Sequence, residues 1–367
     1  MKKSIFAICD LEASYARNLT EYMNERRNTP FEVQAFTNVE SLKAFAGENH
    51  IDLLLISPDA MCEEIRKLDV ERIIMLSNGE PLGNLEEPCI YKYQPSDCLL
   101  AEVMNYYART SPQLQPSALP DTGMNIIGIY SPLGRVGKTS LALVMGEILG
   151  EREKVLYLNL EDYNGFEALF LQNYPSDISD LIYFARQKEG NLIYKLNGMI
   201  QTFHHLDYIP PAFLPGDLKN VRYEEWVDFL GKTAGNTEYD TLILDFGHQI
   251  DETFQLLRYC RRIYMPVLDD VISRAKLFQF EKNASVLECT DILKKTVQIQ
   301  LPEWKLPENG RDWLAVLVKG KLGQYVRRLL DGEGQEERSA AEFPEETGGE
   351  RRRIQGEPIW RMRDSDS

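Results

Sequence analysis

The chain has 367 residues, of which 43% are hydrophobic, and this length favours two domains with sizeable cores. Its formal charge of -16 argues against broad binding to nucleic acid or anionic lipid, because neutralising phosphate requires clustered Lys and Arg. The 6 cysteines lack a C-x-x-C pair, which suggests neither a zinc site nor a redox dithiol and indicates reduced thiols. The N-terminal apolar run stops at Asp10, before a signal peptide or membrane span is reached. We therefore expect a soluble cytoplasmic protein.

Residues 1–109 alternate apolar strand-like runs with amphipathic helical segments. The expected elements read, in order, KSIFAICD, ASYARNLTEYMNERR, FEVQAF, VESLKAFAGE, IDLLLIS, ERIIMLS, CIYKY and SDCLLAEVMNYYAR. Continuous apolar strands between amphipathic helices predict a parallel sheet covered on both faces. Residues 110–124, rich in Pro and Ser and almost without charge, are expected to form a linker to a second domain.

Residues 125–330 repeat the alternation and begin with a strand, a glycine-containing loop and a helix. The loop is SPLGRVGKTS, residues 131–140, and the helix is expected from about Lys138 to Leu149. Further strands are predicted at KVLYLNL, TLILDFG and RIYMPV. A phosphate-binding loop requires this order, because exposed backbone N–H groups and the positive end of the helix dipole converge on the anion. The alternative is a glycine-containing turn that carries GKT by coincidence.

The loop resembles the deviant Walker A motif of the MinD/ParA superfamily of ATPases. The ordinary Walker motif needs a glycine where this chain has Pro132, whereas the deviant pattern K-G-G-x-G-K-[ST] matches the spacing. That pattern falls on Leu133, Gly134, Arg135, Val136, Gly137, Lys138 and Thr139. We expect Lys138 to reach the β and γ phosphates, Thr139 to hold Mg²⁺ and Ser140 to bond the α phosphate of ATP.

Two positions of the loop depart from the superfamily pattern. The signature lysine, which reaches the phosphates of a partner subunit in a nucleotide-sandwich dimer, falls on Leu133, and the second glycine falls on Arg135. Leucine cannot neutralise phosphate charge, and a cation supplied in trans is worth roughly 10³ to 10⁵ in rate in related phosphoryl transfers. Hydrolysis is therefore expected to be slow or absent. Arg135 either replaces the missing cation or is a solvated surface arginine.

Two carboxylates downstream are candidates for the catalytic site. After the second strand the superfamily carries D-x-D, whose positions fall on Asn159 and Glu161, so the resemblance implies that Glu161 helps to position the attacking water. Glu161 alternatively ends its strand in solvent. Asp245 follows four apolar residues in TLILDFG and resembles the Walker B aspartate, which holds Mg²⁺ through water. Ligands bind at the carboxyl ends of buried parallel strands, where Asp245 is expected.

The first domain resembles a response-regulator receiver, which implies a flavodoxin-type fold. The receiver's acidic pair falls on Asp10 and Glu12, but its phosphoacceptor aspartate falls on Ser57, which cannot form an acyl phosphate. The receiver's Lys-Pro pair appears only as KYQP, with Lys92 displaced. We expect a pseudo-receiver that serves for docking or dimerisation, in which Asp10 is a leftover of the acidic pair or a local hydrogen-bond acceptor and not a metal ligand.

A pseudo-receiver joined to a deviant Walker ATPase resembles the TadZ/CpaE family of localisation ATPases in tad (Flp-type) pilus assembly. The resemblance implies ATP and Mg²⁺ as cofactors, an ATP-dependent homodimer, pilus-assembly proteins as partners and a polar position reached through them. Membrane contact is expected to be indirect and nucleic acid is not expected as a partner. A productive ParA-like partitioning ATPase and a non-enzymatic scaffold are the alternatives.

The C-terminal region divides into two parts. Residues 313–330 contain the apolar run WLAVLV followed by basic residues, and MinD relatives use a basic amphipathic helix there to bind membrane. Because the apolar run precedes the basic residues, we expect a packed terminal helix of the ATPase domain. Residues 331–367 are rich in charge and poor in large apolar residues, and are expected to be disordered.

Overall fold

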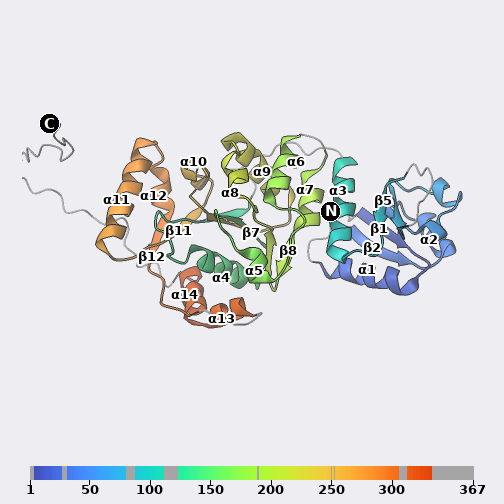
Figure 1. Cartoon of the computed structure of the whole chain (residues 1–367), viewed down its shortest axis with the longest axis horizontal. Helices are drawn as coiled ribbons and strands as arrows, with labels where there is room; N and C mark the ends of the chain where they lie inside the picture. The colour runs from blue at the N-terminus through green and yellow to red at the C-terminus, as the bar shows by residue number, and fades with distance from the viewer. Residues whose placement is uncertain are drawn as a thin grey trace, which may run out of the picture.

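The computed structural model describes residues 4–26, 31–79, 87–110, 123–187, 190–248, 250–251, 253–305 and 312–332. Within these ranges the chain forms two sheets, one before and one after residues 111–122 (Figure 1). The predicted class, two α/β domains with mainly parallel sheets, is confirmed by the strand order. Most of the predicted linker, and the predicted tail beyond Gly332, lie outside the described residues.

The first sheet has strands in the order β2-β1-β3-β4-β5, and all neighbouring pairs are parallel. Flavodoxin-like folds have this order, as expected from the resemblance to a receiver. The strands are β1 Ser4–Cys9, β2 Phe31–Phe36, β3 Leu53–Ile56, β4 Ile73–Ser77 and β5 Cys89–Tyr91.

The first sheet is covered by helices on both faces. Alternate residues of β1 point to opposite faces, so Phe6 and Ile8 pack in one core while Ala7 and Cys9 pack in the other. One core includes residues of the first and third helices, and the other includes residues of the second. The helices are α1 Ala13–Glu25, α2 Val39–Ala46 and α3 Ser96–Thr110, with the short 3-10 helices η1 Pro58–Ala60 and η2 Ile65–Lys67 between β3 and β4.

The second sheet has strands in the order β12-β11-β6-β10-β7-β9-β8. All pairs are parallel except β8 with β9, so the edge strand β8 departs from the predicted fully parallel sheet. The strands are β6 Asn125–Ile129, β7 Val155–Leu160, β8 Gln201–Phe203, β9 Leu206–Ile209, β10 Thr241–Phe246, β11 Arg262–Pro266 and β12 Thr296–Ile299.

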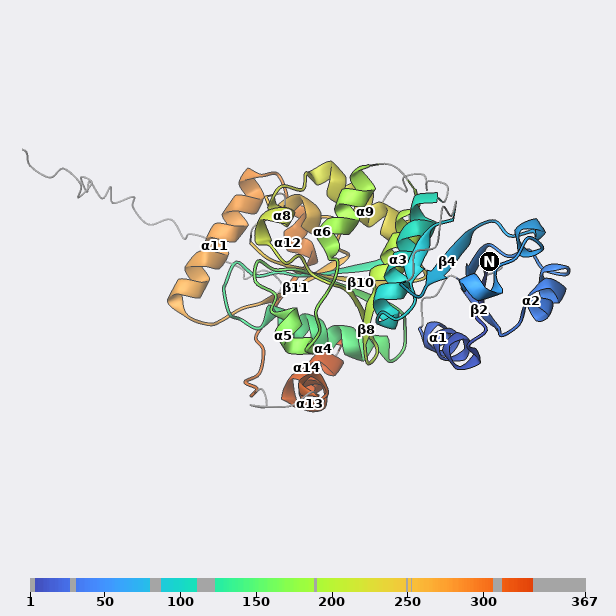
Figure 2. The same cartoon turned by 45° about the vertical axis from the view of Figure 1, so that its right-hand side comes forward.

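Helices also cover both faces of the second sheet (Figure 2). The face that carries Leu156 and Leu242 packs against the helices α6 to α12, and the face that carries Tyr157 and Ile243 packs against α4, α5, α13 and α14. These helices are α4 Lys138–Gly150, α5 Phe166–Phe170, α6 Ile178–Arg186, α7 Leu192–Met199, α8 Pro215–Lys219, α9 Tyr223–Asn236, α10 Thr253–Leu257, α11 Val271–Val286, α12 Asp291–Lys295, α13 Trp313–Lys319 and α14 Lys321–Leu330.

The two C-terminal helices α13 and α14 pack on α4. Leu314, Leu322, Val326 and Leu329 are buried in the same core as α4. An apolar helix such as α4 needs cover on all sides, and α13 and α14 supply it on the side away from the sheet. The prediction of a packed terminal helix is confirmed by this arrangement. In the described part of the chain, none of the helices combines the length and apolar character that crossing a membrane requires.

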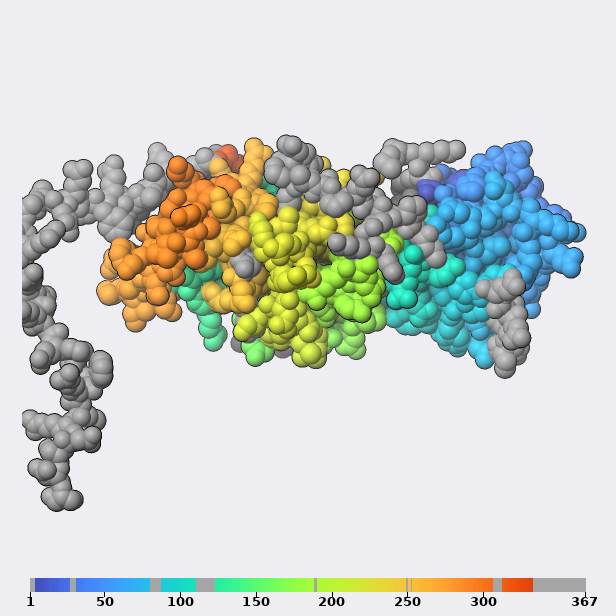
Figure 3. Space-filling model, turned by 90° about the horizontal axis from the view of Figure 1, so that it is seen from above, coloured from blue at the N-terminus to red at the C-terminus, as the bar shows by residue number. Residues whose placement is uncertain are grey.

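The first domain is joined to the second through α3 and α7. The rings of Tyr107 and Tyr194 lie edge to face, with centroids 4.5 Å apart, and the Asn191 backbone N–H donates to the Ala108 carbonyl at 2.7 Å. A Cβ on Gly198 would lie 2.6 Å from the Cβ of Met104, so the helices approach too closely for a side chain there. The chain is elongated, with the first domain at one end (Figure 3).

Candidate functional site

The registers of the second sheet bring the predicted site residues to one edge. Asp245 of β10 lies opposite Ile129 of β6 on one side and Asn159 of β7 on the other. Because all three strands are parallel, their carboxyl ends meet at this edge, and the loops that follow them surround it. Gly247 allows the close approach of two of these loops, since a Cβ there would lie 2.4 Å from the carbonyl oxygen of Leu160.

Contacts with Pro266 and with Trp304 fix the loop between β6 and α4. Ser131 is fully buried, and its hydroxyl donates to the Pro266 carbonyl at 2.8 Å while accepting from the Leu133 backbone N–H at 3.2 Å. Gly137 precedes α4 with φ of 85°, a left-handed conformation that favours glycine. The indole of Trp304 packs on the same residue, because a Cβ added to Gly137 would lie 2.4 Å from a ring carbon.

Lys138 begins α4 and makes an ion pair within the site. Its side chain is only 7% exposed, and Nζ lies 2.9 Å from Oε1 of Glu161. The backbone of Glu161 is fixed by Asn159, because the Glu161 N–H donates to the Asn159 side-chain oxygen at 2.9 Å. The structure thus brings together two residues that the sequence places 23 positions apart, with the ammonium at the amino end of a helix where anions bind.

Asp245 is fully buried at the centre of this edge. Its Oδ2 accepts from the Tyr157 hydroxyl at 3.0 Å, and Asn159 Nδ2 donates to that hydroxyl at 2.8 Å. Burial and the Glu161 charge raise the pKa of Asp245 to about 7, against the opposing influence of Thr139, Lys138 and Tyr157. The other carboxylate oxygen, Oδ1, is buried and has no hydrogen-bond partner within the described residues.

These groups fit a magnesium ion. A hard cation prefers carboxylate and hydroxyl oxygens, and Asp245, near the end of β10, and Thr139, in the first turn of α4, provide them close to each other. The free Oδ1 of Asp245 supplies an acceptor without a protein donor, and a nearby cation would favour its charged form. Mg²⁺ bound there would neutralise phosphate charge, while Lys138 and the loop amides would hold the phosphates.

The remaining predicted residues divide by exposure. Gly134 and Arg135 are exposed at the outer side of the loop, whereas Val136 is buried and Gly137, Thr139 and Ser140 are half-buried. Leu133 is only 3% exposed, so its side chain packs into the domain and presents nothing to a neighbouring molecule. Arg135 has φ of 59°, an uncommon conformation for a residue with a Cβ, at the position where the superfamily pattern has glycine.

A hollow of about 680 Å³ lies next to the loop on the side of β11 and β12. Arg135 and Val136 form one wall, Val267 and Leu268 after β11 form another, and Trp304 contributes a ring. Its lining is mostly apolar, as in pockets that take flat organic groups.

At the carboxyl edge of the first sheet, a buried lysine lies between the acidic residues that follow β1. Lys92 follows β5, and its Nζ lies 2.8 Å from Asp10 Oδ2 and 2.9 Å from Glu12 Oε2. Burial opposes the charge on Lys92, but the bonds to Asp10 and Glu12 outweigh it and raise its pKa. Ser57 is buried at the end of β3, as predicted, and its hydroxyl has no hydrogen-bond partner within the described residues.

The sequence analysis missed two residues of these edges and misread the role of a third. Tyr157 and Trp304 belong to no recognised motif. Tyr157 lies in an apolar strand and Trp304 follows one, and aromatic residues at such positions are ordinary parts of a core. Tyr157 lies two positions before Asn159, on the same face of β7, and this spacing was the available signal. Lys92 was treated as displaced from the receiver pattern, but in the structure it reaches both acids.

No family model and no curated protein sequence matches the chain. Solved structures resemble part of it. A ParA family ATPase from Chlorobium tepidum is 18% identical, with 55% of this chain and 96% of that one covered, at a TM-score of 0.44. A plasmid partition protein from Borrelia burgdorferi is 18% identical, with 57% and 98% covered, at 0.41. Cobyrinic acid a,c-diamide synthase from Mycobacterium smegmatis, solved with an ATP analogue and magnesium, is 12% identical, with 58% and 97% covered, at 0.40.

Proposed function

We propose that the chain is a nucleotide switch that binds ATP with Mg²⁺ at the loop between β6 and α4. The observation that carries this proposal is the meeting of Lys138, at the start of α4, with a buried Asp245 whose Oδ1 lacks a protein donor. The first residue supplies a cation for the phosphates and the second supplies a ligand for the metal. The hollow beside Trp304 is the proposed place of the base and ribose.

The ion pair between Lys138 and Glu161 is proposed to be the resting state of the switch. Phosphate oxygens would replace the Glu161 carboxylate as the partner of Lys138, which frees Glu161 to position a water molecule. Turnover is proposed to be slow or absent, because Leu133 is buried and offers no cation to a second subunit. Dimerisation with ATP is supported by exposed apolar residues that follow strands at this edge, namely Tyr163, Phe213, Leu214, Leu268, Val271 and Ile272.

Titration calorimetry with Mg-ATP tests the binding site. We expect micromolar affinity for the native chain and a loss of at least about 100-fold, or about 2.7 kcal/mol, in Lys138→Ala. Lys154→Ala is the matched control, because Lys154 is a surface lysine of the same domain whose ammonium pairs with the exposed Glu238. Equal ATP affinity in Lys138→Ala and the native chain would leave the non-enzymatic scaffold as the remaining function.

The biological role is a further part of the proposal. A first domain of receiver-like topology, joined to this ATPase-like domain, supports the role of positioning tad-type pilus machinery through protein partners at a cell pole. Sedimentation with and without Mg-ATP tests the homodimer on which that role depends. DNA binding by the ATP-bound chain would instead support the partitioning ATPase, against which the net charge of -16 argues.

A further inference from the structure

A second hollow, of about 440 Å³, lies at the opposite edge of the second sheet from the phosphate loop. Asn125 and Arg262, the first residues of β6 and β11, lie in its wall, together with the last turns of α4 and α14. Its apolar lining consists of Ile127, Ile148, Leu149, Tyr264 and Leu330. The proposed function uses none of these residues.

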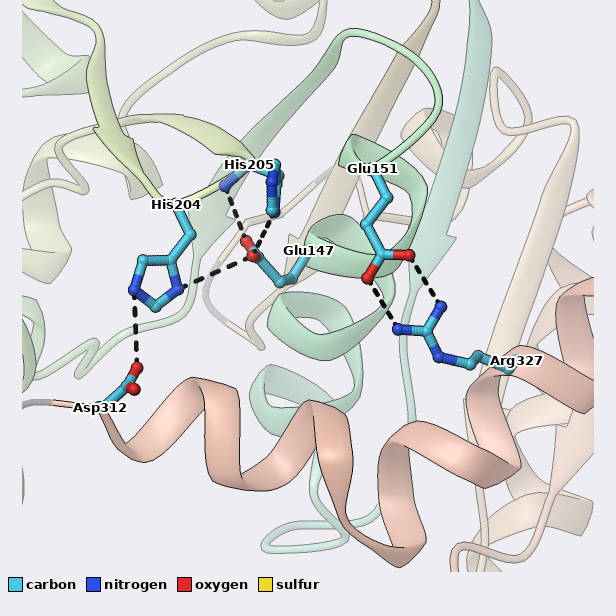
Figure 4. A network of polar contacts seen from close by, with 6 residues as sticks. All are labelled: Glu147, Glu151, His204, His205, Asp312 and Arg327. Carbon is cyan, nitrogen blue, oxygen red and sulfur yellow. Dashed lines mark hydrogen bonds and ion pairs between the residues drawn. The ribbon is translucent and has the colours of Figure 1, made fainter.

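Arginines surround this apolar lining. Arg327 is engaged, because both of its terminal nitrogens bond Glu151, at 2.9 and 2.7 Å, and this pair clamps α14 to the end of α4 (Figure 4). The side chain of Arg152 is 72% exposed, and its ion pair with Asp331 is long, at 3.9 Å. The guanidinium groups of Arg261 and Arg262 make no hydrogen bond or ion pair with any described residue.

The hollow is therefore cationic in a chain that is strongly acidic. Its lining holds Arg152, Arg261, Arg262 and Arg327 against Glu153 and Asp331, and Glu151 neutralises Arg327 from just outside the lining, which leaves a formal charge of +1 (4 − 3). Glu153 already accepts a hydrogen bond from the Thr241 hydroxyl at 2.7 Å. Cations above an apolar floor suit a ligand that combines carboxylates with an apolar group.

We propose that the segment Glu342–Glu346 of the same chain, EFPEE, docks in this hollow. Phe343 fits the apolar floor, and Glu342, Glu345 and Glu346 provide carboxylates for Arg261 and Arg262. The position of α14 favours this occupant, since Asp331, one residue after its end, lies in the wall of the hollow. The ten intervening residues, 332–341, are mostly small or polar, and ten residues reach at most about 33 Å, which covers the distance from the end of α14 to the hollow.

Tethering favours the chain's own segment over a separate acidic ligand. A short flexible connection gives an effective concentration of roughly millimolar, so weak contacts suffice for occupancy. Docking does not depend on ATP binding, because the hollow and the phosphate loop lie at opposite edges of the sheet.

Hydrogen exchange of the full chain, read by mass spectrometry, tests the proposal. We expect the peptide that contains Phe343 to exchange more slowly than the flanking peptides, together with protection of residues 261–264. Arg261→Glu combined with Arg262→Glu should reduce this protection about tenfold, the equivalent of about 1.4 kcal/mol. Phe343→Ala should do the same without altering the hollow. Equal exchange in the native chain and in both variants would overturn the proposal.

Two further variants separate docking from misfolding and from unspecific charge effects. Arg274→Glu with Lys282→Glu makes the same change of charge on α11, outside the hollow, and should leave the protection unchanged. Adding Glu345→Arg and Glu346→Arg to the double arginine variant reverses both charges and should restore protection. Protection that weakens on dilution would instead assign the segment to a second copy, and failure of the charge reversal would contradict the ionic contacts.

Discussion

The carboxyl edges of the two sheets each hold a buried lysine paired with acid, yet only one edge has the form of a ligand site. Lys138 starts a helix, follows a glycine of left-handed conformation and, among the residues that the structure describes, forms an ion pair with Glu161 alone. Lys92 follows a strand, has two partners, Asp10 and Glu12, and lies under the rings of Tyr15 and Tyr93 at 4.5 and 5.4 Å.

The two edges differ in what surrounds the lysine and its acids. At the second edge, the proposed switch relies on loop amides and the helix dipole to hold phosphate after Glu161 has moved. At the first edge, the lysine stands among the acids that would bind a metal in a receiver, and its charge satisfies them. The first edge is thus filled by Lys92 itself, while at the second edge the proposal has phosphate replace Glu161 as the partner of Lys138.

The largest expected effect concerns Asp245, at the carboxyl edge of the second sheet, because the pKa of its carboxyl is raised. Below pH 3.8 its carboxyl is protonated in both the folded and unfolded states and costs nothing. As the pH rises to about 7, the unfolded state loses its proton first, so this group lowers the free energy of unfolding by about 4 kcal/mol in total. Asp245→Asn should therefore be more stable than the native chain at pH 8 but not at pH 4.

Urea unfolding at the two pH values checks this, with the exposed Asp217→Asn as control. The same carboxyl should make Mg²⁺ binding pH-dependent, since the metal must displace the proton. Affinity for Mg²⁺ in the presence of ATP should fall about fivefold from pH 7 to pH 6, because the deprotonated fraction of a carboxyl with a pKa of about 7 falls by that factor. Stability and Mg²⁺ affinity that do not change over these ranges would show that Asp245 does not titrate there.

The next largest effect is expected on stability when Lys92, at the carboxyl edge of the first sheet, is replaced. Lys92→Met leaves Asp10 buried without its cation, which we expect to lower the free energy of unfolding by about 3 kcal/mol. Lys67→Met, on the exposed side of η2, should change stability by less than about 0.5 kcal/mol. ATP affinity should be unaltered in both variants. A weakened ATP affinity in Lys92→Met with the fold intact would mean that the two edges are coupled, contrary to the contrast drawn above.

The smallest effect is expected at Arg135, which is exposed in the loop between β6 and α4. If this arginine only attracts phosphate through solvent, Arg135→Ala should weaken ATP binding by at most about fivefold, or about 1 kcal/mol. Steady-state phosphate release should change by a similar factor. A fall of 10³ or more in turnover, roughly the value of a trans-acting cation, would show instead that Arg135 replaces the missing lysine.

Local sequence predicted the parts of the site that one strand-loop-helix unit specifies. The order from Ile126 to Ser140 predicted a helix that starts at Lys138, because strand, glycine and helix formers follow each other directly. The pair Lys138–Glu161 was not predicted, since it depends on the register between strands that are distant in sequence. The pair Lys92–Asp10 was not predicted either. Lys92 is displaced from the lysine position of the receiver pattern, and the sequence alone did not show that its long side chain still reaches Asp10.

Amide exchange of the two edges, measured with and without Mg-ATP, tests the central claim most directly. The account predicts that Mg-ATP protects the peptides that cover residues 133–140 and 245–248, and leaves those that cover residues 10–15 and 91–94 unchanged. Unchanged exchange in residues 133–140 at saturating Mg-ATP, or protection at the first edge instead, would contradict it.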